Sequence, residues 1–196
     1  IEPKEEIRLK TNIQVFKPVK DRTSIKVMTQ YEENPYPRWV NLRLNSNPVT
    51  ISELVDKLKI RLVNQKIKLV EAPQILIAGC GTGQHSIGAS KQFKNSQLLA
   101  VDLSLTSLAY AKRKTNELNI ENIQYMQADI LQLNKLDRYF DIIESGGVLH
   151  HMKDPLAGWK VLTNCLKPNG LMKIALYSEL AREHIIKIRE EIEQLN

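Results

Sequence analysis

The chain of 196 residues is 42% hydrophobic, which is enough for one sizeable domain with a packed core and an appendage. No apolar run approaches the roughly 20 residues that span a bilayer, and no secretory signal stands at the start, so the sequence predicts no membrane partner. Two cysteines, Cys80 and Cys165, cannot build a disulfide framework or a zinc-ligand pair at their spacing, so we expect no metal and a cytoplasmic setting.

The net charge of +6 comes from the first part of the chain. Residues 1–70 contain 14 Lys and Arg against 8 Asp and Glu, whereas residues 71–196 contain 14 of each, and all eight glycines lie at or beyond Gly79. We therefore expect a basic N-terminal extension over residues 1–70 and a second unit over residues 71–196. A basic extension can bind nucleic acid, but its charges are scattered, which favours a solvated surface.

The extension begins with a polar segment that contains short β-like pieces such as residues 13–16. Residues 30–39 then combine aromatic residues with prolines, and this composition requires extended or turned backbone. Tyr31, Tyr36 and Trp39 in this segment allow two interpretations, a lid over a bound ligand or an aromatic plug that packs the extension onto the domain. We favour the plug.

A helix is predicted at the end of the extension. Ser52 is a residue type typical of helix N-caps. The apolar residues around and behind it fall at helical spacing and predict an amphipathic helix of about three to four turns. These residues are Ile51, Leu54, Val55, Leu58 and Leu62.

From Gln74 onward, short apolar runs alternate with segments of helical pattern. The strand-like runs are residues 74–78, 97–102, 122–127, 139–145 and 170–177. The helix-like runs lie around residues 84–94, 104–118, 154–166 and 179–194. Short apolar strands separated by helices predict an α/β fold, a Rossmann-like, doubly wound parallel sheet with helices on both faces.

The first strand opens into a glycine-rich loop. Residues 75–83 read ILIAGCGTG, an apolar run that breaks into three glycines, Gly79, Gly81 and Gly83. Glycines just past a buried strand permit tight turns and let a ligand approach the backbone closely. The helix that follows turns its N-terminal amides toward the same loop. The loop therefore predicts a ligand site.

Acidic residues follow the neighbouring strands. Asp102 ends the second strand, 23 residues past Gly79, which is the spacing at which a carboxylate reaches the hydroxyls of a ribose. Asp129 ends the third strand and Glu144 lies at the end of the fourth. Because parallel strands present their carboxyl ends at one edge of the sheet, these residues predict a nucleoside pocket.

Two common nucleotide ligands do not fit the loop. A dinucleotide fingerprint needs a third glycine where this chain has Gln84, which argues against a nicotinamide-dependent oxidoreductase. The phosphate loop of nucleotide hydrolases requires a Gly-Lys-Ser/Thr sequence, which is missing. A ligand without a pyrophosphate is the better match.

Six motifs in this order resemble a class I S-adenosylmethionine-dependent methyltransferase. They are residues 79–83 (GCGTG), 101–104 (VDLS), 127–129 (QAD), 140–143 (FDII), 147–152 (GVLHHM) and 166–170 (LKPNG). The resemblance covers about residues 74–178. Residues 31–39 and 176–182 resemble more narrowly a bacterial group whose methyltransferase domain follows tetratricopeptide repeats, so such a region is expected in the parent protein.

The resemblance implies S-adenosyl-L-methionine as cofactor and assigns residues to it. Gly79 and Gly81 would lie beside its amino-acid end, Asp102 would bind the ribose hydroxyls, and Asp129 would bind the adenine amino group. The complete set of expected cofactor-binding residues is Gly79, Cys80, Gly81, Gly83, Asp102, Leu103, Ala128, Asp129 and Glu144.

The chain departs from the family pattern in two places. Family members often carry an acidic residue two places before the first glycine, where this chain has Ile77, so the ammonium group of the cofactor needs another partner, for which backbone carbonyls are candidates. The family's sheet usually closes with a β-hairpin after the fifth strand and its helix, whereas the sequence ends at Asn196. We expect that hairpin to be missing and the fifth strand to form an exposed edge.

His150 and His151 follow the fourth strand and are the candidate catalytic residues. Either could act as a general base because imidazole titrates near neutral pH, although a packing or capping role is an equal alternative. Methyl transfer often needs little beyond alignment of the reactants. We expect His85 to cap or pack at its helix start and Cys80 to fill space rather than act as a nucleophile.

The sequence thus predicts a methyltransferase that moves a methyl group from S-adenosylmethionine to an unidentified acceptor, with a small molecule favoured. A non-catalytic module that keeps the fold and binds a protein partner is the main alternative, consistent with Ile77 and the short C-terminus. A methyltransferase that binds RNA through residues 1–70 is a second alternative.

Overall fold

The computed structural model describes residues 2–178 and positions 181, 183, 185, 188, 191 and 192. Its strands form one sheet in the order β1-β4-β3-β2-β5-β6, and all neighbouring strands are parallel. The strands are β1 (Gln14–Val15), β2 (Gln74–Ala78), β3 (Gln97–Asp102), β4 (Ile123–Gln127), β5 (Phe140–Gly146) and β6 (Leu166–Ala175). The α-helices are α1 (Glu2–Asn12), α2 (Arg22–Glu33), α3 (Ile51–Lys57), α4 (Gln84–Ser90), α5 (Leu105–Glu117) and α6 (Pro155–Asn164). Short 3-10 helices are η1 (Lys66–Leu69), η2 (Ile130–Lys135) and η3 (Leu149–His151).

The two faces of the sheet carry separate hydrophobic cores. Along β2, Ile75 and Ile77 point into the core shared with α4 and α5, whereas Leu76 and Ala78 point into the core shared with η2 and α6. All four side chains are fully buried, which explains why the strand is a continuous apolar run instead of an alternating one. The predicted doubly wound α/β fold is confirmed.

Most predicted element bounds agree with the structure. The strands predicted at 74–78 and 97–102 are β2 and β3. The fifth strand is longer than predicted, because β6 begins at Leu166 and its register with β5 shifts between Phe140 and Ile142. β6 stands last in the strand order, so it forms an edge of the sheet in the described part of the chain. The helix predicted over 179–194 falls mostly on residues outside those described.

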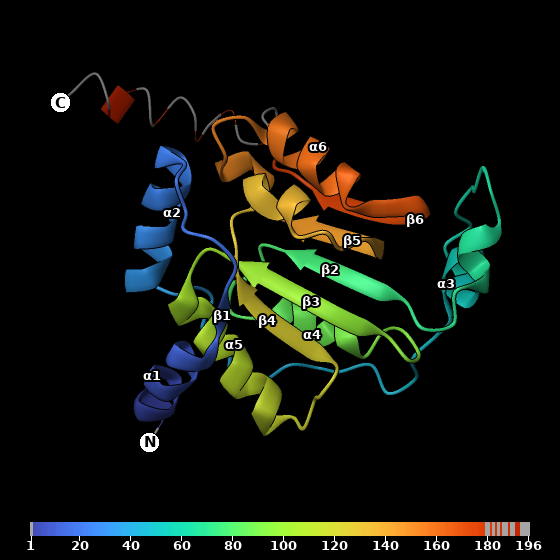
Figure 1. The fold of residues 1–196 in the computed structure, drawn as a ribbon, viewed down its shortest axis with the longest axis horizontal. Coiled ribbons are helices and arrows are strands. Elements are labelled where there is room, and N and C mark those ends of the chain that lie inside the picture. The colour runs from blue at the N-terminus through green and yellow to red at the C-terminus, as the bar shows by residue number, and fades with distance from the viewer. Residues whose placement is uncertain are drawn as a thin grey trace.

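The N-terminal extension packs directly on the sheet and its helices. β1 pairs in parallel with β4, where Gln14 lies opposite Met126, and so forms the other edge strand of the described sheet. α1 packs against α5. Figure 1 shows α2 beyond the carboxyl ends of the strands, toward which the arrowheads point, and α3 at the opposite ends. The β-like piece at 13–16 was therefore a correct prediction, whereas α1 and α2 were not predicted.

The helix predicted near Ser52 forms, but its start and length differ from the prediction. Thr50 is the N-cap: its side chain accepts from the backbone N–H of Glu53, and the Glu53 carboxylate accepts from the Thr50 N–H at 2.6 Å. This reciprocal capping box fixes the start two residues before Ser52. The helix ends at Lys57, and Lys59 adopts a left-handed φ of 54°, which stops a helix.

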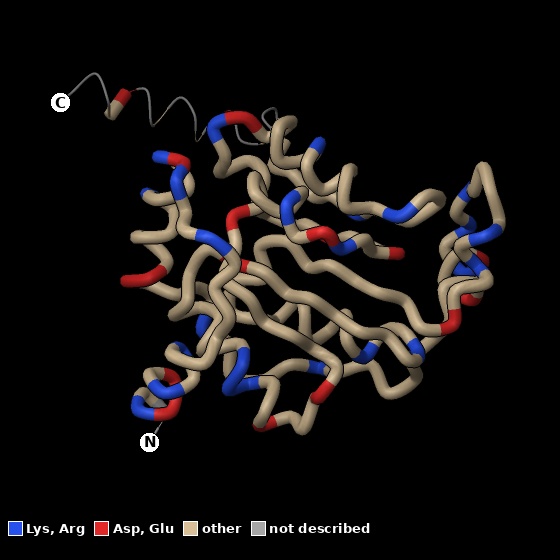
Figure 2. Tube along the Cα trace, in the orientation of Figure 1, with Lys and Arg blue, Asp and Glu red and all other residues tan. Residues whose placement is uncertain are grey.

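Charged residues are interspersed over the surface. Figure 2 shows Lys and Arg next to Asp and Glu both on α1 at the lower left and around α3 at the right. Basic and acidic positions are therefore mixed on both of these elements. None of the helices within the described residues is both long and apolar enough to span a bilayer.

Candidate cofactor site

A pocket of about 360 Å³ lies at the carboxyl ends of the central strands. Its walls come from α2, the extended segment after α2, the glycine loop after β2, the ends of β3 and β4, and the loop after β5. Parallel strands place all their carboxyl ends at one edge, so residues far apart in sequence meet there. This is where the acidic residues were predicted to converge.

Asp102 holds the glycine loop in place. The backbone N–H of Gly81 donates to Asp102 Oδ2 at 2.8 Å, and the N–H of Ser104 donates to Oδ1 at 2.9 Å. Gly81 has a φ of 52°, in the left-handed region that favours glycine, and this conformation turns its N–H toward the carboxylate. The N–H of Gly79 donates to the carbonyl of Val101 at 2.8 Å, which fixes the start of the loop.

The carboxylate of Asp102 retains acceptor capacity toward the pocket, because each oxygen can accept more than one hydrogen bond. Burial raises the pKa of Asp102, and the hydrogen bonds from Ser104 and Gly81 offset only part of that effect. The side chain of Asp102 is not the cap of the following helix, α5. Ser104 is the N-cap of α5 instead, and its hydroxyl accepts from the N–H of Ser107 at 3.0 Å.

Asp129 lines the same pocket and carries one oxygen without a partner. Its Oδ1 accepts from the backbone N–H of Leu131 at 2.9 Å, so Asp129 caps η2. Its Oδ2 is buried and makes no hydrogen bond within the described residues. Ser107 is also in the pocket wall, and its buried hydroxyl oxygen likewise makes no hydrogen bond within the described residues. Orphaned buried polar atoms are costly unless a ligand or water satisfies them.

The remaining predicted residues divide between the pocket wall and its support. Gly79, Cys80, Leu103 and Ala128 line the pocket together with Gly81, Asp102 and Asp129. Gly83 lies outside the wall: with a φ of 87° it begins α4, and a Cβ there would come within 2.5 Å of the Cβ of Ala111. The helix packing of α4 against α5 therefore requires this glycine.

Glu144 also lies outside the wall. It is buried on β5, where its Oε2 lies 2.7 Å from His85 Nε2 and 3.1 Å from Lys173 Nζ. Burial raises the pKa of Glu144, but the hydrogen bonds and charges of His85 and Lys173 outweigh this effect and leave the pKa below its usual value. His85 itself lines the pocket. Sequence reasoning had assigned it a packing role, because nothing local indicates a partner on β5.

The two candidate catalytic histidines occupy different positions. His151 is exposed and lines the pocket. The ring of His150 stacks on Tyr177 with centroids 3.7 Å apart and an interplanar angle of 29°, and His150 is not part of the pocket wall. Cys80 is buried, and burial raises the pKa of its thiol well above the ordinary value, which keeps it protonated as expected for a filler. The described residues contain no cluster that could hold a metal ion.

The aromatic segment serves as a plug and a pocket wall at once. Trp39 is buried, packs edge-to-face on Tyr110, and donates from Nε1 to the carbonyl of Thr82 at 3.0 Å. The Thr82 hydroxyl donates to the carbonyl of Pro37 at 2.6 Å, so the segment is tied to the glycine loop at two points. The predicted plug applies to Trp39. Tyr31 and Tyr36 line the pocket instead.

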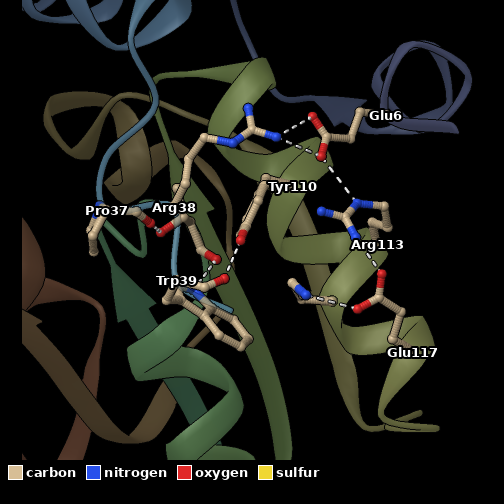
Figure 3. Close-up of polar contacts among 9 residues, drawn as sticks. Glu6, Pro37, Arg38, Trp39, Tyr110, Arg113 and Glu117 are labelled. Atoms are coloured by element: carbon tan, nitrogen blue, oxygen red, sulfur yellow. Dashed lines mark hydrogen bonds and ion pairs between the residues drawn. The ribbon is translucent and has the colours of Figure 1, made fainter. Parts of the chain in front are cut away.

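An ion-pair cluster anchors the same segment to the N-terminal helix. Glu6 of α1 accepts from Arg38 Nη2 at 3.1 Å and from Arg113 Nε of α5 at 3.0 Å. Arg113 also pairs with Glu117. Figure 3 shows Glu6 between the two guanidinium groups and Trp39 below Tyr110. The segment around Arg38 and Trp39 is therefore held both by the glycine loop and by α1.

Comparisons with known proteins identify a methyltransferase domain in the chain. The family model described as "Methyltransferase domain" matches residues 75–170. An uncharacterised protein of Synechococcus is 33% identical over 121 residues, which cover 61% of this chain and 29% of that protein. A malonyl-[acyl-carrier protein] O-methyltransferase of Halalkalibacterium halodurans is 31% identical over 110 residues, which cover 55% of this chain and 40% of the enzyme.

A solved S-adenosylmethionine-dependent methyltransferase from Clostridium acetobutylicum shares the fold. It superposes with a TM-score of 0.51 at 23% identity, covering 76% of this chain and 56% of that structure. The chain thus spans well under two thirds of these relatives' own lengths.

Proposed function

We propose that this chain, which belongs to the class I S-adenosylmethionine-dependent methyltransferases, binds S-adenosylmethionine in the pocket above the glycine loop and transfers its methyl group to an acceptor. The observation that carries the proposal is the convergence of Asp102, Asp129 and the loop around Gly81 on one pocket. Family membership gives the reaction class, and the residues of the pocket give the binding mode.

The residues present fit an adenosine. The unpartnered Oδ2 of Asp129 is a buried acceptor and suits the exocyclic amino group of adenine. Asp102, with both oxygens already positioned by backbone donors, suits the two ribose hydroxyls. Each carboxylate is fixed by backbone hydrogen bonds before the ligand arrives, so little side-chain ordering is required on binding.

The pocket suits a ligand that carries no phosphate. Neither Lys nor Arg occurs among the described residues of its wall, whose formal charges come from Asp102 and Asp129. A diphosphate would meet net negative charge there, whereas a sulfonium cation would be attracted. This charge pattern supports S-adenosylmethionine over nicotinamide dinucleotides, as the position of Gln84 in the loop had indicated.

When bound, S-adenosylmethionine supplies a methyl group on a positively charged sulfur; the acceptor's lone pair forms the new bond to carbon while the old bond's electrons stay on sulfur. The chain's contribution is alignment and exclusion of water. Tyr31 and Tyr36 line the pocket on the side of the N-terminal extension. We assign the uptake of the acceptor's proton to His151 of the wall, and His150 orders Tyr177 by stacking.

Calorimetric titration with S-adenosylhomocysteine, the demethylated product, tests the binding mode. We expect the wild-type protein to bind it, and Asp102→Asn or Asp129→Asn to weaken binding about 10- to 100-fold, since each removes a charged hydrogen bond worth roughly 1.5–3 kcal/mol. Asp137→Asn is the matched control, because Asp137 is exposed and lies outside the pocket. Failure of the wild-type protein to bind would refute the proposal.

Turnover is tested separately, by incubation with S-adenosylmethionine and a panel of small-molecule acceptors and detection of S-adenosylhomocysteine. A small-molecule acceptor is our proposal, and product formation with a member of the panel is the expected result. Tight binding of S-adenosylmethionine without turnover on small molecules or on proteins would favour the non-catalytic module.

We also propose a division into an extension at residues 1–70 and a methyltransferase unit at residues 71–196, which rests on composition. A cytoplasmic setting is supported by the two free, buried cysteines. A tetratricopeptide-repeat region in the parent protein is a prediction from the sequence alone, and a nucleic-acid partner is the less favoured alternative.

A further inference from the structure

The proposed cofactor ends in an amino acid, which must also find partners in the pocket wall. Its ammonium group calls for an acceptor, preferably one backed by negative charge. Asp102 and Asp129 are the two charged residues among those that line the pocket, and the proposed function commits both to the nucleoside. Ile77, at the position where the family often carries an acid, is an apolar and fully buried side chain.

His85 is a polar group of the wall that the proposed binding mode leaves unused. It is the second residue of α4, directly after the glycine loop, and 36% of its side chain is exposed. Its Nε2 is committed to Glu144 Oε2 at 2.7 Å. The described residues give the imidazole no other hydrogen bond, so Nδ1 is the ring nitrogen left for a ligand.

Glu144 supplies the negative charge behind the ring. Its side chain is only 6% exposed, so its charge is poorly screened by solvent. Glu144 lies opposite Ile77 in the register of β5 and β2, and both side chains project from the same face of the sheet, the one that α4 covers. The carboxylate of Glu144 therefore lies on the strand next to position 77. His85 contacts this carboxylate and also lines the pocket, so it connects the two.

We infer that His85, oriented by Glu144, binds the ammonium group at the amino-acid end of S-adenosylmethionine. The inference rests on the proposed function and deepens it. An ammonium ligand favours the neutral form of the ring, because an imidazolium would repel it and has no acceptor. The neutral imidazole donates through Nε2–H to Glu144, and the lone pair of Nδ1 is then the acceptor. The carboxylate fixes the tautomer and the ring orientation and makes the ring a stronger acceptor. His85 is the binding residue, and Glu144 is a positioning residue that acts through it.

Calorimetric titration with three ligands separates this contact from all others. S-adenosylhomocysteine carries the complete amino acid, its deaminated analogue keeps the carboxylate but lacks the amine, and methylthioadenosine lacks the amino acid altogether. We expect His85→Ala to weaken S-adenosylhomocysteine binding about 10- to 100-fold and to leave the other two ligands within about threefold of wild type. Unchanged methylthioadenosine binding also shows that the variant is folded.

Two further variants test the role of Glu144. Glu144→Gln should show the same ligand pattern with a smaller loss, and His85→Ala combined with Glu144→Gln should bind no more weakly than His85→Ala alone, because the two residues act as one unit. Lys173→Met is the matched control. This substitution removes the other ion-pair partner of Glu144. Because the side chain of Lys173 is 71% exposed, the substitution should leave the affinities for all three ligands within about twofold of wild type.

Three results would overturn the inference. Undiminished binding of S-adenosylhomocysteine to His85→Ala would show that the ring makes no contact with the amino acid. An equal loss for all three ligands would place the effect at the nucleoside or in the fold. An equal loss for S-adenosylhomocysteine and its deaminated analogue would assign His85 to the carboxylate. In each of these cases the wild-type protein still binds, so the proposed function survives, whereas absence of wild-type binding would overturn both.

Discussion

Replacing Glu6 by Gln should destabilise the protein substantially although Glu6 lies far from the glycine loop in sequence. Its carboxylate is the shared acceptor of Arg38 and Arg113, and the side chain of Arg113 is only 2% exposed. The isosteric amide removes the negative charge and turns an N–H₂ group toward two guanidinium donors. Arg113 then keeps Glu117 as its partner, whose side chain is 44% exposed.

The expected loss of stability follows from this burial. Breaking a buried ion pair by removing one partner costs roughly 3–5 kcal/mol, and because Glu117 still neutralises Arg113 we take the lower end, about 3 kcal/mol. For a chain of this size that corresponds to a fall in Tm of about 6–12 °C. Urea denaturation followed by circular dichroism measures the free energy of unfolding directly.

Glu5→Gln is the matched control for this experiment. Glu5 is the neighbouring residue of α1, and its side chain makes no hydrogen bond or ion pair with the described residues. Its substitution should change the free energy of unfolding by no more than about 0.5 kcal/mol. If Glu6→Gln and Glu5→Gln unfold at the same urea midpoint as wild type, the claim that the extension is anchored through Glu6 is refuted.

Three other predictions concern the pocket and its support. Gly83→Ala should lower the free energy of unfolding, measured by urea denaturation, by about 2 kcal/mol or more, because the left-handed backbone and the nearby Ala111 oppose a side chain. Gly88→Ala is the control: Gly88 lies in α4 with open space around it, so this substitution should be neutral or stabilising by up to about 1 kcal/mol. Equal effects at both sites would contradict the packing argument. Burial raises the pKa of Asp102 in the folded protein, so ionisation of its carboxyl group disfavours folding. The wild-type protein should therefore lose stability relative to Asp102→Asn as the pH rises from the ordinary pKa of 3.8 through the pKa in the folded protein. A difference in stability that does not change with pH would contradict this prediction. The pKa of Glu144 is lowered in the folded protein, so its contribution to stability is present above the ordinary pKa of 4.5 and is lost as the pH falls through the pKa in the folded protein. The difference in stability between wild type and Glu144→Gln should therefore shrink in acid. A difference that stays constant with pH would be inconsistent with the ion pair.

The parts of the fold that the sequence predicted are those set by local pattern. β2 and β3 were predicted with their observed bounds because both faces of each strand are buried, which produces uninterrupted apolar runs. α1 and α2 were not predicted, because they depend on contacts with distant residues. The Glu6–Arg113 pair joins positions 107 residues apart, and no local periodicity reveals it.

The candidate site divides in the same way. Asp102 and Asp129 could be assigned to a common pocket because each lies at or just beyond the carboxyl end of a strand, and parallel topology brings these ends together. His85 could not be assigned, because its partner Glu144 lies 59 residues away on a strand whose register is known only from the structure. Gly83 was grouped with the ligand-binding glycines by motif, whereas its neighbour Ala111 shows that it supports helix packing.

A crystal structure of the protein with S-adenosylhomocysteine would show directly whether the two carboxylates bind the adenosine. We expect the adenine amino group within hydrogen-bonding distance of Asp129 Oδ2, and both ribose hydroxyls on the carboxylate of Asp102. Density for the ligand elsewhere on the molecule, or an adenosine in this pocket that leaves Asp129 Oδ2 without a donor, would contradict this binding mode.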